Sequence, residues 1–147
     1  MRLFLVHHAE AVSPVIDAER PLSSAGLLHA ETLAAAARDA GVKPAAIWHS
    51  GKRRSRETAE TFWRVCNPLS SLRMVRGLRP EDSPDWMRDV LRVEEQDVLL
   101  VGHMPNLPAL LHALTGDVEF PLHGLVWLDR SEDGTFVERR RWGFHSS

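Results

Sequence analysis

Two short apolar runs in the sequence end abruptly in histidine. Residues 3–6 precede His7 and His8, and residues 98–101 are followed, one glycine later, by His103. Runs of this length and composition predict buried strands. Ligands bind beyond the carboxyl ends of the strands in parallel sheets, so two such strands could present imidazoles at one sheet edge. The plainer alternative is that the histidine pair only terminates an edge strand.

A basic segment opens the helix that we predict over about residues 52–66. Lys52, Arg53, Arg54 and Arg56 fall in its first turn, where positive side chains oppose the helix macrodipole. Because a helix N-terminus and guanidinium groups both attract anions, this segment indicates a phosphate or carboxylate site. A solvated basic face would explain the same residues.

The elements that must position these side chains alternate along the chain. We expect strands at about residues 3–6, 45–49, 72–75, 97–101, 125–129 and 135–140, and helices at about 23–40, 52–66, 86–93 and 105–115. Strands alternating with helices imply parallel βαβ units, and the last two strands form a hairpin around a turn at Asp133-Gly134. The prediction is an α/β fold, a three-layer α/β/α sandwich with a mostly parallel central sheet and an antiparallel C-terminal hairpin.

The first predicted helix has candidate N-caps at Ser23 and Ser24. Leu27, Ala30, Ala34 and Ala37 share one face at helical spacing, so we expect all four to pack on the sheet.

Composition limits the classes of protein that fit. The chain has 147 residues, of which 44% are hydrophobic and 26% charged, as expected for one globular domain spanning residues 1–147. The net charge of −2 gives no reason to expect nucleic acid as a partner. Cys66 is the only cysteine, which excludes an internal disulfide and favours a reducing, cytoplasmic location. We see no signal peptide and no run approaching the ~20 apolar residues of a membrane helix, so no membrane partner is expected.

Three motifs occur in a fixed order along the chain. They are His7-His8-Ala9 after the first strand, Ser50 with Arg54 and then Thr58-Ala59-Glu60, and residues 101–105, which read Val-Gly-His-Met-Pro. In this order they resemble the signatures of the histidine phosphatase superfamily, also called phosphoglycerate mutase-like. The closest likeness is to its short SixA-type phosphohistidine phosphatases.

The resemblance covers nearly the whole chain. A further family pattern, at the start of the first helix, is matched by Arg20-Pro21-Leu22-Ser23 and Gly26. It implies a phosphoglycerate mutase-like fold and hydrolysis of a phosphorylated protein or a small phosphorylated substrate.

The resemblance also implies roles for individual residues. His8 would be the nucleophile and would form a phosphohistidine that water then hydrolyses. Arg54 would hold phosphate oxygens bidentately, and His103 would donate to another phosphate oxygen. His7 would be a further phosphate ligand beside these catalytic residues. The scheme requires no metal and no cofactor.

The first motif departs from the family, which has Arg-His-Gly where this chain has His7, His8 and Ala9. Loss of a charge-assisted hydrogen bond costs about 1.5–3 kcal/mol, which is roughly a ten- to hundredfold loss of transition-state binding. A protonated His7 would recover part of this, which predicts activity that falls above pH ~6.5. Alanine at position 9 is tolerable only where the backbone does not need a positive φ.

The identity of a general acid is the second departure. Many mutase-like relatives carry a glutamate after the third strand, and Glu81 is the candidate acid here, with Asp82 beside it and Pro80 competing for the matching position. The sequence therefore offers no clear general acid. A leaving group of low basicity needs less protonation, so phosphohistidine or another activated phosphate is the favoured substrate.

Two other readings fit parts of the pattern. His7, His8, His49 and His103 could bind zinc or copper, although the sequence has no cysteine pair and no His-x₃-His helix face to support such a site. Without the motif arginine, the chain could instead be an inactive relative that binds a phosphorylated partner. We interpret His29, His112, His123 and His145 as ordinary helix, loop or tail residues, although His123 could line the pocket from the loop before the hairpin.

Overall fold

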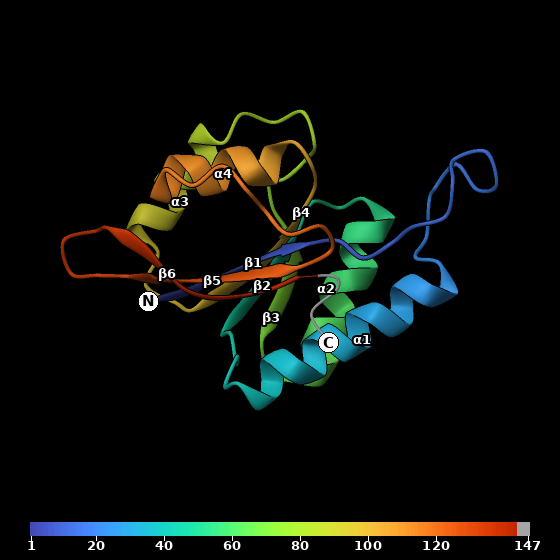
Figure 1. Cartoon of the computed structure of the whole chain (residues 1–147), viewed down its shortest axis with the longest axis horizontal. Helices are drawn as coiled ribbons and strands as arrows, with labels where there is room; N and C mark the ends of the chain where they lie inside the picture. The colour runs from blue at the N-terminus through green and yellow to red at the C-terminus, as the bar shows by residue number, and fades with distance from the viewer. Residues whose placement is uncertain (144–147) are drawn as a thin grey trace.

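The structure of the protein is a computed structural model that describes residues 1–143. This part of the chain contains six strands and four helices (Figure 1). The strands are β1 (Arg2–His7), β2 (Ala46–His49), β3 (Ser71–Met74), β4 (Val98–Gly102), β5 (Leu125–Arg130) and β6 (Phe136–Trp142). The helices are α1 (Ser24–Asp39), α2 (Arg53–Cys66), α3 (Asp85–Val93) and α4 (Asn106–Thr115). Each element lies within two residues of its predicted bounds.

One six-stranded sheet has the strand order β3-β2-β4-β1-β5-β6. The pairs among β1 to β4 are parallel, whereas β5 pairs antiparallel with β1 and β6 antiparallel with β5. Helices connect the parallel strands, because a parallel crossover needs a long connection. The predicted fold class is confirmed.

Strand β1 is buried on both faces, which places it at the centre of the molecule. Leu3 and Leu5 point into a core with Met87 of α3 and the apolar residues of α4. Phe4 and Val6 point into the opposite core, which includes buried residues of α1 and α2. Side chains alternate across a strand, so β1 packs against a helical layer on each side. The result is the three-layer sandwich visible in Figure 1.

Helix α1 differs from the prediction at its first turn. Ser23 caps it by accepting from the Gly26 N–H at 3.0 Å. Leu27 is 43% exposed, so the prediction that it faces the core is wrong, and Gly26 is buried in its place. The reason is a close approach: a Cβ on Gly26 would overlap the carbonyl oxygen of Glu10. The chain after β1 therefore packs directly on the start of α1.

The parallel strands bring their carboxyl ends to one edge of the sheet. In the registers of β1–β4 and β2–β4, His7 lies opposite Gly102 and His49 opposite Val101. Among residues 1–143, no helix combines the length and apolar character that crossing a membrane demands. His145 lies outside the described residues.

Candidate active site

Three neighbouring parallel strands deliver buried polar residues to the same edge of the sheet. His8 follows β1, His103 follows β4 and Ser50 follows β2, and all three are buried. The ring centroids of His8 and His103 lie 5.0 Å apart. Residues far apart in the sequence therefore converge because their strands are adjacent in the sheet.

The His8 ring is held in one tautomer by the backbone. Its Nδ1 lies 2.7 Å from the carbonyl oxygen of Ala9, and a carbonyl can only accept, so Nδ1 carries the proton. Burial, aided by the Arg54 charge and opposed by this hydrogen bond, lowers the pKa of His8 to about 4. Above that pH the ring is neutral, and Nε2 presents a lone pair suited to nucleophilic attack.

The His7 ring is fixed in the opposite tautomer. Its Nδ1 accepts from the backbone N–H of His123 at 2.8 Å, so the proton of the neutral ring lies on Nε2. Burial, followed by the charges of His8 and His123, lowers the pKa of His7 to about 2. The prediction that a protonated His7 replaces the missing guanidinium is therefore wrong. His7 can offer only a neutral N–H to a phosphate.

His123 contacts both histidines of the first motif. Its ring stacks on His7, with centroids 4.8 Å apart and planes 3° apart, and its Nδ1 donates to the His8 carbonyl at 2.7 Å. The residue has a φ of 51°, a backbone conformation that is uncommon outside glycine and asparagine. The sequence favoured an ordinary loop residue at position 123, with a place at the pocket as an alternative, and gave no signal for this double contact.

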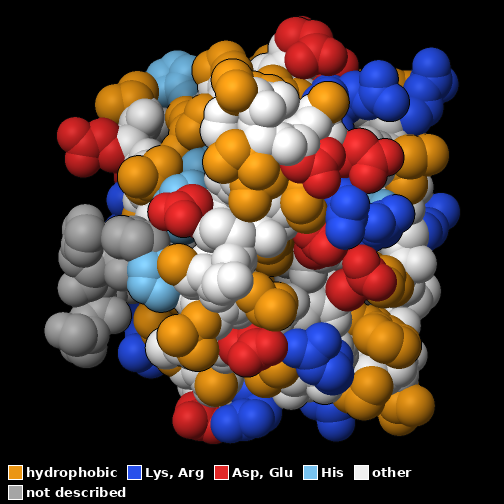
Figure 2. Space-filling model, turned by 90° about the vertical axis from the view of Figure 1, so that its right-hand side faces the viewer, with side chains coloured by type: hydrophobic (Ala, Val, Ile, Leu, Met, Phe, Trp, Pro, Cys, Tyr) orange, Lys and Arg blue, Asp and Glu red, His pale blue; other side chains and the backbone are white. Residues whose placement is uncertain are grey.

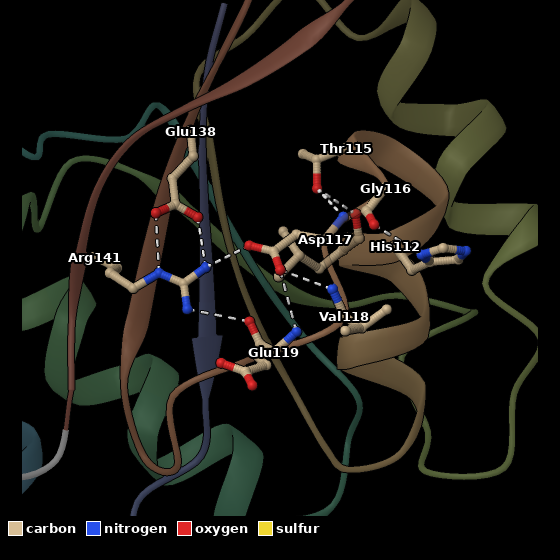
Figure 3. Close-up of polar contacts among 9 residues, drawn as sticks. His112, Thr115, Gly116, Asp117, Val118, Glu119, Glu138 and Arg141 are labelled. Atoms are coloured by element: carbon tan, nitrogen blue, oxygen red, sulfur yellow. Dashed lines mark hydrogen bonds and ion pairs between the residues drawn. The ribbon is translucent and has the colours of Figure 1, made fainter.

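A second network anchors the segment that carries His123. Arg141 of β6 binds the Glu138 carboxylate through two nitrogens, donates to Asp117 at 2.9 Å, and donates to the Glu119 carbonyl at 3.1 Å (Figure 3). Asp117 and Glu119 lie just after α4, at the start of the chain that leads to His123. The hairpin thereby holds this connection against the sheet.

The N-terminus of α2 is tied to the strand ends through two hydroxyl groups. Ser55 accepts from the Ser50 N–H at 3.1 Å and donates to the Val101 carbonyl at 2.9 Å. Thr58 accepts from the Ala9 N–H at 3.1 Å. Ala9 is not among the described residues with positive φ, so its replacement of glycine imposes no backbone strain there.

Arg54 places a positive charge beside His7, His8 and His103. Its charge contributes to the lowered pKa of His7, His8 and His103. Burial, and then the neighbouring Arg20, lower the pKa of Arg54 itself. Its buried Nε finds no hydrogen-bond partner among residues 1–143. This guanidinium is available to an anion.

Arg20 is a second guanidinium at the site, to which the sequence reasoning assigned no role. It has a φ of 51°, and its Nε donates to the Val12 carbonyl at 3.1 Å. Its charge acts on His8, Arg54 and His103, lowering the pKa of each. The available signal was its position in the Arg-Pro-Leu-Ser match, which brings it to the start of α1.

His103 is neutral and has one free ring nitrogen. Burial, and then the charges of His8 and Arg54, lower its pKa to about 3. Its Nε2 lies 2.6 Å from Ser50 Oγ, which itself accepts from the Lys52 N–H at 3.3 Å. Ser50 can donate its proton to Nε2 or accept one from it, because a hydroxyl oxygen can accept two hydrogen bonds. Nδ1 is buried and has no hydrogen-bond partner within the described chain.

The candidate acids do not join this cluster. Glu81 is exposed, and the structure gives it no contact with the histidines within residues 1–143. The Asp82 carboxylate accepts from the Arg79 N–H at 2.9 Å. Burial, the Ala9 hydrogen bond and positively charged groups shift the pKa of His8, and burial and positively charged groups shift that of His103; no carboxylate of the described chain is among the causes for either.

The predicted metal ligands divide into separate environments. His49 accepts from the Gly51 N–H at 3.1 Å, and the residues with metal-ligand spacing are instead His7, His8 and His123, whose ligand atoms lie within 4.8 Å of one another. A metal ligand needs a lone pair, but the neutral His7 ring carries its proton on Nε2 while Nδ1 accepts from a backbone N–H. A metal would have to break that arrangement, so this set fits a metal poorly.

Comparisons with solved structures identify proteins of the same fold. A structure of the protein histidine phosphatase SixA complexed with tungstate aligns with a TM-score of 0.88 and 20% identity, covering 98% of this chain and 97% of the other. A protein of Agrobacterium tumefaciens assigned as the phosphohistidine phosphatase SixA aligns at 0.81 with 25% identity and 97% coverage of both chains. A phosphoserine phosphatase variant of Entamoeba histolytica in complex with phosphoserine aligns at 0.73 with 12% identity, covering 99% and 98%.

At the level of sequence, no family model matches the chain and no curated protein matches it. The structural neighbours are phosphohistidine phosphatases and other phosphoglycerate mutase-like histidine phosphatases. The predicted resemblance is confirmed at the level of fold.

Proposed function

We propose that the protein is a phosphatase that cleaves an activated phosphate, with phosphohistidine favoured, through a phosphohistidine formed on His8. The observation that carries this proposal is the tautomer of His8, whose Nδ1–H is held by the Ala9 carbonyl beside Arg54 and His103. Its support from known structures is that the neighbours include phosphatases, one of which holds the oxyanion tungstate.

The first step is an in-line attack on phosphorus. The Nε2 lone pair of His8 forms the P–N bond while the bond to the leaving group breaks, and the leaving group takes that electron pair. The ring becomes a phosphorylated imidazolium. The hydrogen bond from Nδ1–H to the Ala9 carbonyl strengthens as this positive charge develops.

The remaining groups of the cluster stabilise the transferring phosphoryl oxygens. Arg54 and Arg20 supply positive charge, and His7 and His103 supply neutral N–H donors. Phosphoryl transfer relies on positioning and electrostatic stabilisation of this kind.

The second step regenerates the protein. Water attacks the phosphorus of phosphorylated His8, the P–N bond breaks, and its electron pair returns to Nε2. Phosphate leaves as dihydrogen phosphate, carrying the oxygen and both protons of the water, and His8 is again neutral, as its lowered pKa favours.

The substrate preference follows from the absence of a carboxylate contact to His8 or His103 within residues 1–143. With no acid beside the scissile bond, the leaving group must depart without protonation by the protein. We expect a phosphohistidine peptide or an aryl phosphate to be hydrolysed far faster than glycerol phosphate. Equal rates on these substrates would contradict this preference.

The decisive experiment is to trap the intermediate. The protein is incubated with ³²P-labelled phosphoramidate, and we expect acid-labile, base-stable label on His8 that is lost by turnover. His8→Ala should abolish labelling, whereas His112→Ala, which changes an exposed histidine of α4, should not. Phosphate binding without any labelling would instead favour the inactive binding module.

A further inference from the structure

A cavity of about 620 Å³ lies beside the catalytic cluster. It is formed by the end of β3, the segment that follows it, and the start of α3, with Ser50, Met74, Arg76, Arg79 and Trp86 among its lining residues. This volume is within the usual range of small-molecule sites. Nothing in the two chemical steps above makes use of it.

Two contacts join the cavity to the phosphate site. Ser50 lines the cavity and also lies 2.6 Å from His103 through its hydroxyl oxygen. Met74 packs against the turn that precedes α2, so closely that a Cβ on Gly51 would overlap its sulfur. A phosphoryl group held between His8 and His103 would therefore have its leaving group within reach of this cavity.

One wall of the cavity is an exposed indole held in place by its neighbours. Trp86 is 55% exposed, and the Arg76 guanidinium carbon lies 5.6 Å from its ring centroid. The backbone at Gly77 is so close that a Cβ there would lie 2.7 Å from Trp86 Cδ1. Met74 adds a second apolar surface, 62% exposed. Planar rings stack favourably on surfaces of this kind.

The charge of the cavity is positive on balance. Arg76 and Arg79 form no ion pair among residues 1–143, whereas Arg88 of the adjoining helix pairs with Asp85 and Asp89. Asp82 is the acidic residue of the lining. The molecular end toward which β1 runs has mixed character, with hydrophobic side chains among basic and acidic ones (Figure 2). Two uncompensated guanidinium groups beside an indole favour a ring that carries negative charge.

We propose that this cavity binds the leaving group of the substrate, and that the leaving group is a planar ring with an anionic group on it or next to it. The inference rests on the proposed phosphatase function. Trp86 and Met74 contact the ring, and Arg76 and Arg79 contact the anion. The ring could belong to a histidine within an acidic peptide or to a free small molecule, and the experiment separates these sources.

The test uses two matched substrates, 4-carboxyphenyl phosphate and 4-carbamoylphenyl phosphate, which differ in charge but little in size. We expect kcat/KM to be about three- to tenfold higher for the carboxylate, although its leaving group is the more basic. Arg76→Gln should remove this preference. Arg73→Gln is the matched control, because Arg73 stacks on Trp48 and does not line the cavity.

The ring contact has its own variant and its own control substrate. Trp86→Leu should raise KM for both aryl phosphates about fivefold or more. It should leave kcat/KM for acetyl phosphate unchanged, because that small substrate has no ring to reach the cavity. An equal loss on acetyl phosphate would mean that Trp86 acts on the catalytic cluster itself and would overturn the inference.

Failure of the inference and failure of the proposed function give different results. The cavity inference is overturned if both aryl phosphates are hydrolysed without a charge preference. It is also overturned if Arg73→Gln and Arg76→Gln have equal effects. Neither result contradicts the proposed phosphatase function. If no compound is hydrolysed, the proposed function fails. Calorimetric binding of 4-carboxyphenyl phosphate to His8→Ala, with and without Arg76→Gln, then decides the cavity inference.

The source of the ring is resolved with phosphohistidine peptides. A higher kcat/KM for a peptide with aspartates around the phosphohistidine than for one with asparagines identifies a protein substrate, provided that Arg76→Gln removes the difference. A charge preference confined to the aryl phosphates identifies a free small molecule.

Discussion

The two sides of the phosphate site are built on different principles. On the side of β2 and α2, Arg54 is a charged group with no hydrogen-bond partner at its buried Nε among residues 1–143. On the side of β1, His7 is a neutral ring fixed by the backbone N–H of His123 at 2.8 Å. The first side can stabilise an anion by charge. The second has no charge, so it can stabilise an anion only if the N–H of His7 lies within hydrogen-bond distance of a phosphate oxygen.

Burial explains why the second side stays neutral. His7, His8 and His123 lie ring against ring, and the charge of one imidazole would oppose the charge of the next. Arg54 and Arg20 add positive charge near the same rings. Protonation of His7 or His8 would cost desolvation as well as repulsion. A neutral histidine is therefore compatible with this environment, whereas a charged one is not.

The largest effect is expected from removing charge on the first side. Arg54→Gln should lower kcat/KM roughly ten- to a hundredfold, because a charge-assisted contact of about 1.5–3 kcal/mol is lost. Arg56→Gln is the matched control, since Arg56 is exposed and pairs with Glu60 at 3.5 Å. Steady-state kinetics on an aryl phosphate measure both variants. Equal losses would show that the helix terminus acts as a general basic surface.

A smaller effect is expected from disturbing position on the second side. His123→Asn keeps the backbone N–H to His7 and tolerates the positive φ, but loses the ring stacked on His7 and the bond to the His8 carbonyl. One neutral hydrogen bond of about 0.5–1.5 kcal/mol corresponds to a loss of roughly two- to tenfold in kcat/KM.

His112→Asn provides the control for His123→Asn, because it makes the same exchange at an exposed position. His123→Gly should resemble His123→Asn, since both keep the backbone bond. Unchanged kinetics in a fully folded His123→Asn protein would show that the stacked ring has no part in positioning His7 or His8.

The two sides also differ in how far the sequence could predict them. Strand ends at His8 and His103 were predictable, because apolar runs define strands and parallel strands align their carboxyl ends. The contact of His7 with His123 spans 116 positions and depends on a residue with φ of 51°. Hydrophobic pattern carries no information on either feature. The prediction of a protonated His7 failed for the same reason. Burial, followed by the charges of His8 and His123, lowers its pKa, and the sequence did not predict the contact with His123.

A similar limit applies to the orientation of α1. Helical spacing placed Leu27 with the buried alanines, but the backbone of Glu10 packs on Gly26 and turns Leu27 outward. The sequence contained the glycine, and the family pattern included it. Its structural reason is a contact between two backbone segments, which side-chain periodicity does not describe.

The pH profile separates a neutral His7 from a charged one. Burial lowers the pKa of His8 to about 4, of His103 to about 3, and of His7 further still. All three are therefore neutral from pH 5.5 to 8, and kcat/KM should be flat over this range once the substrate's own ionisation near pH ~6 is allowed for. Activity should fall only as the pH drops through about 4, where His8 takes up a proton and loses its nucleophilic lone pair.

A stopped assay with one aryl phosphate, fitted with the measured ionisation of that substrate, tests this profile. A corrected rate that declines as the pH rises above ~6.5 would restore the charged His7, because that value is the unperturbed histidine pKa. As a control, protein held at pH 4 should be returned to pH 7 and assayed again. Full recovery of activity would show that the loss at pH 4 reflects protonation and not irreversible unfolding.

The smallest effect is expected farthest from the phosphate, at the anchor of the His123 segment. Arg141→Gln removes the two-nitrogen contact with Glu138 and the bond to Asp117. These side chains are partly exposed to solvent, which screens their ion pairs, so each pair contributes little to stability. Amide hydrogen exchange should nevertheless quicken over residues 117–124 and stay unchanged in β1, with kcat/KM falling less than about twofold.

Arg139→Gln is the control, because Arg139 lies on the same strand and pairs with Asp129 at 3.5 Å, away from the segment. If the second side of the site depends on the position of His123, loss of the Arg141 contacts should make residues 117–124 open more often, even though the global free energy of unfolding hardly changes. Faster exchange in Arg141→Gln, combined with a larger loss of kcat/KM in the His123→Asn background than in the parent protein, would show that coupling directly. Equal exchange in the Arg139→Gln and Arg141→Gln variants would mean that the hairpin does not hold the segment, and that His123 is positioned by its contacts with His7 and His8 alone.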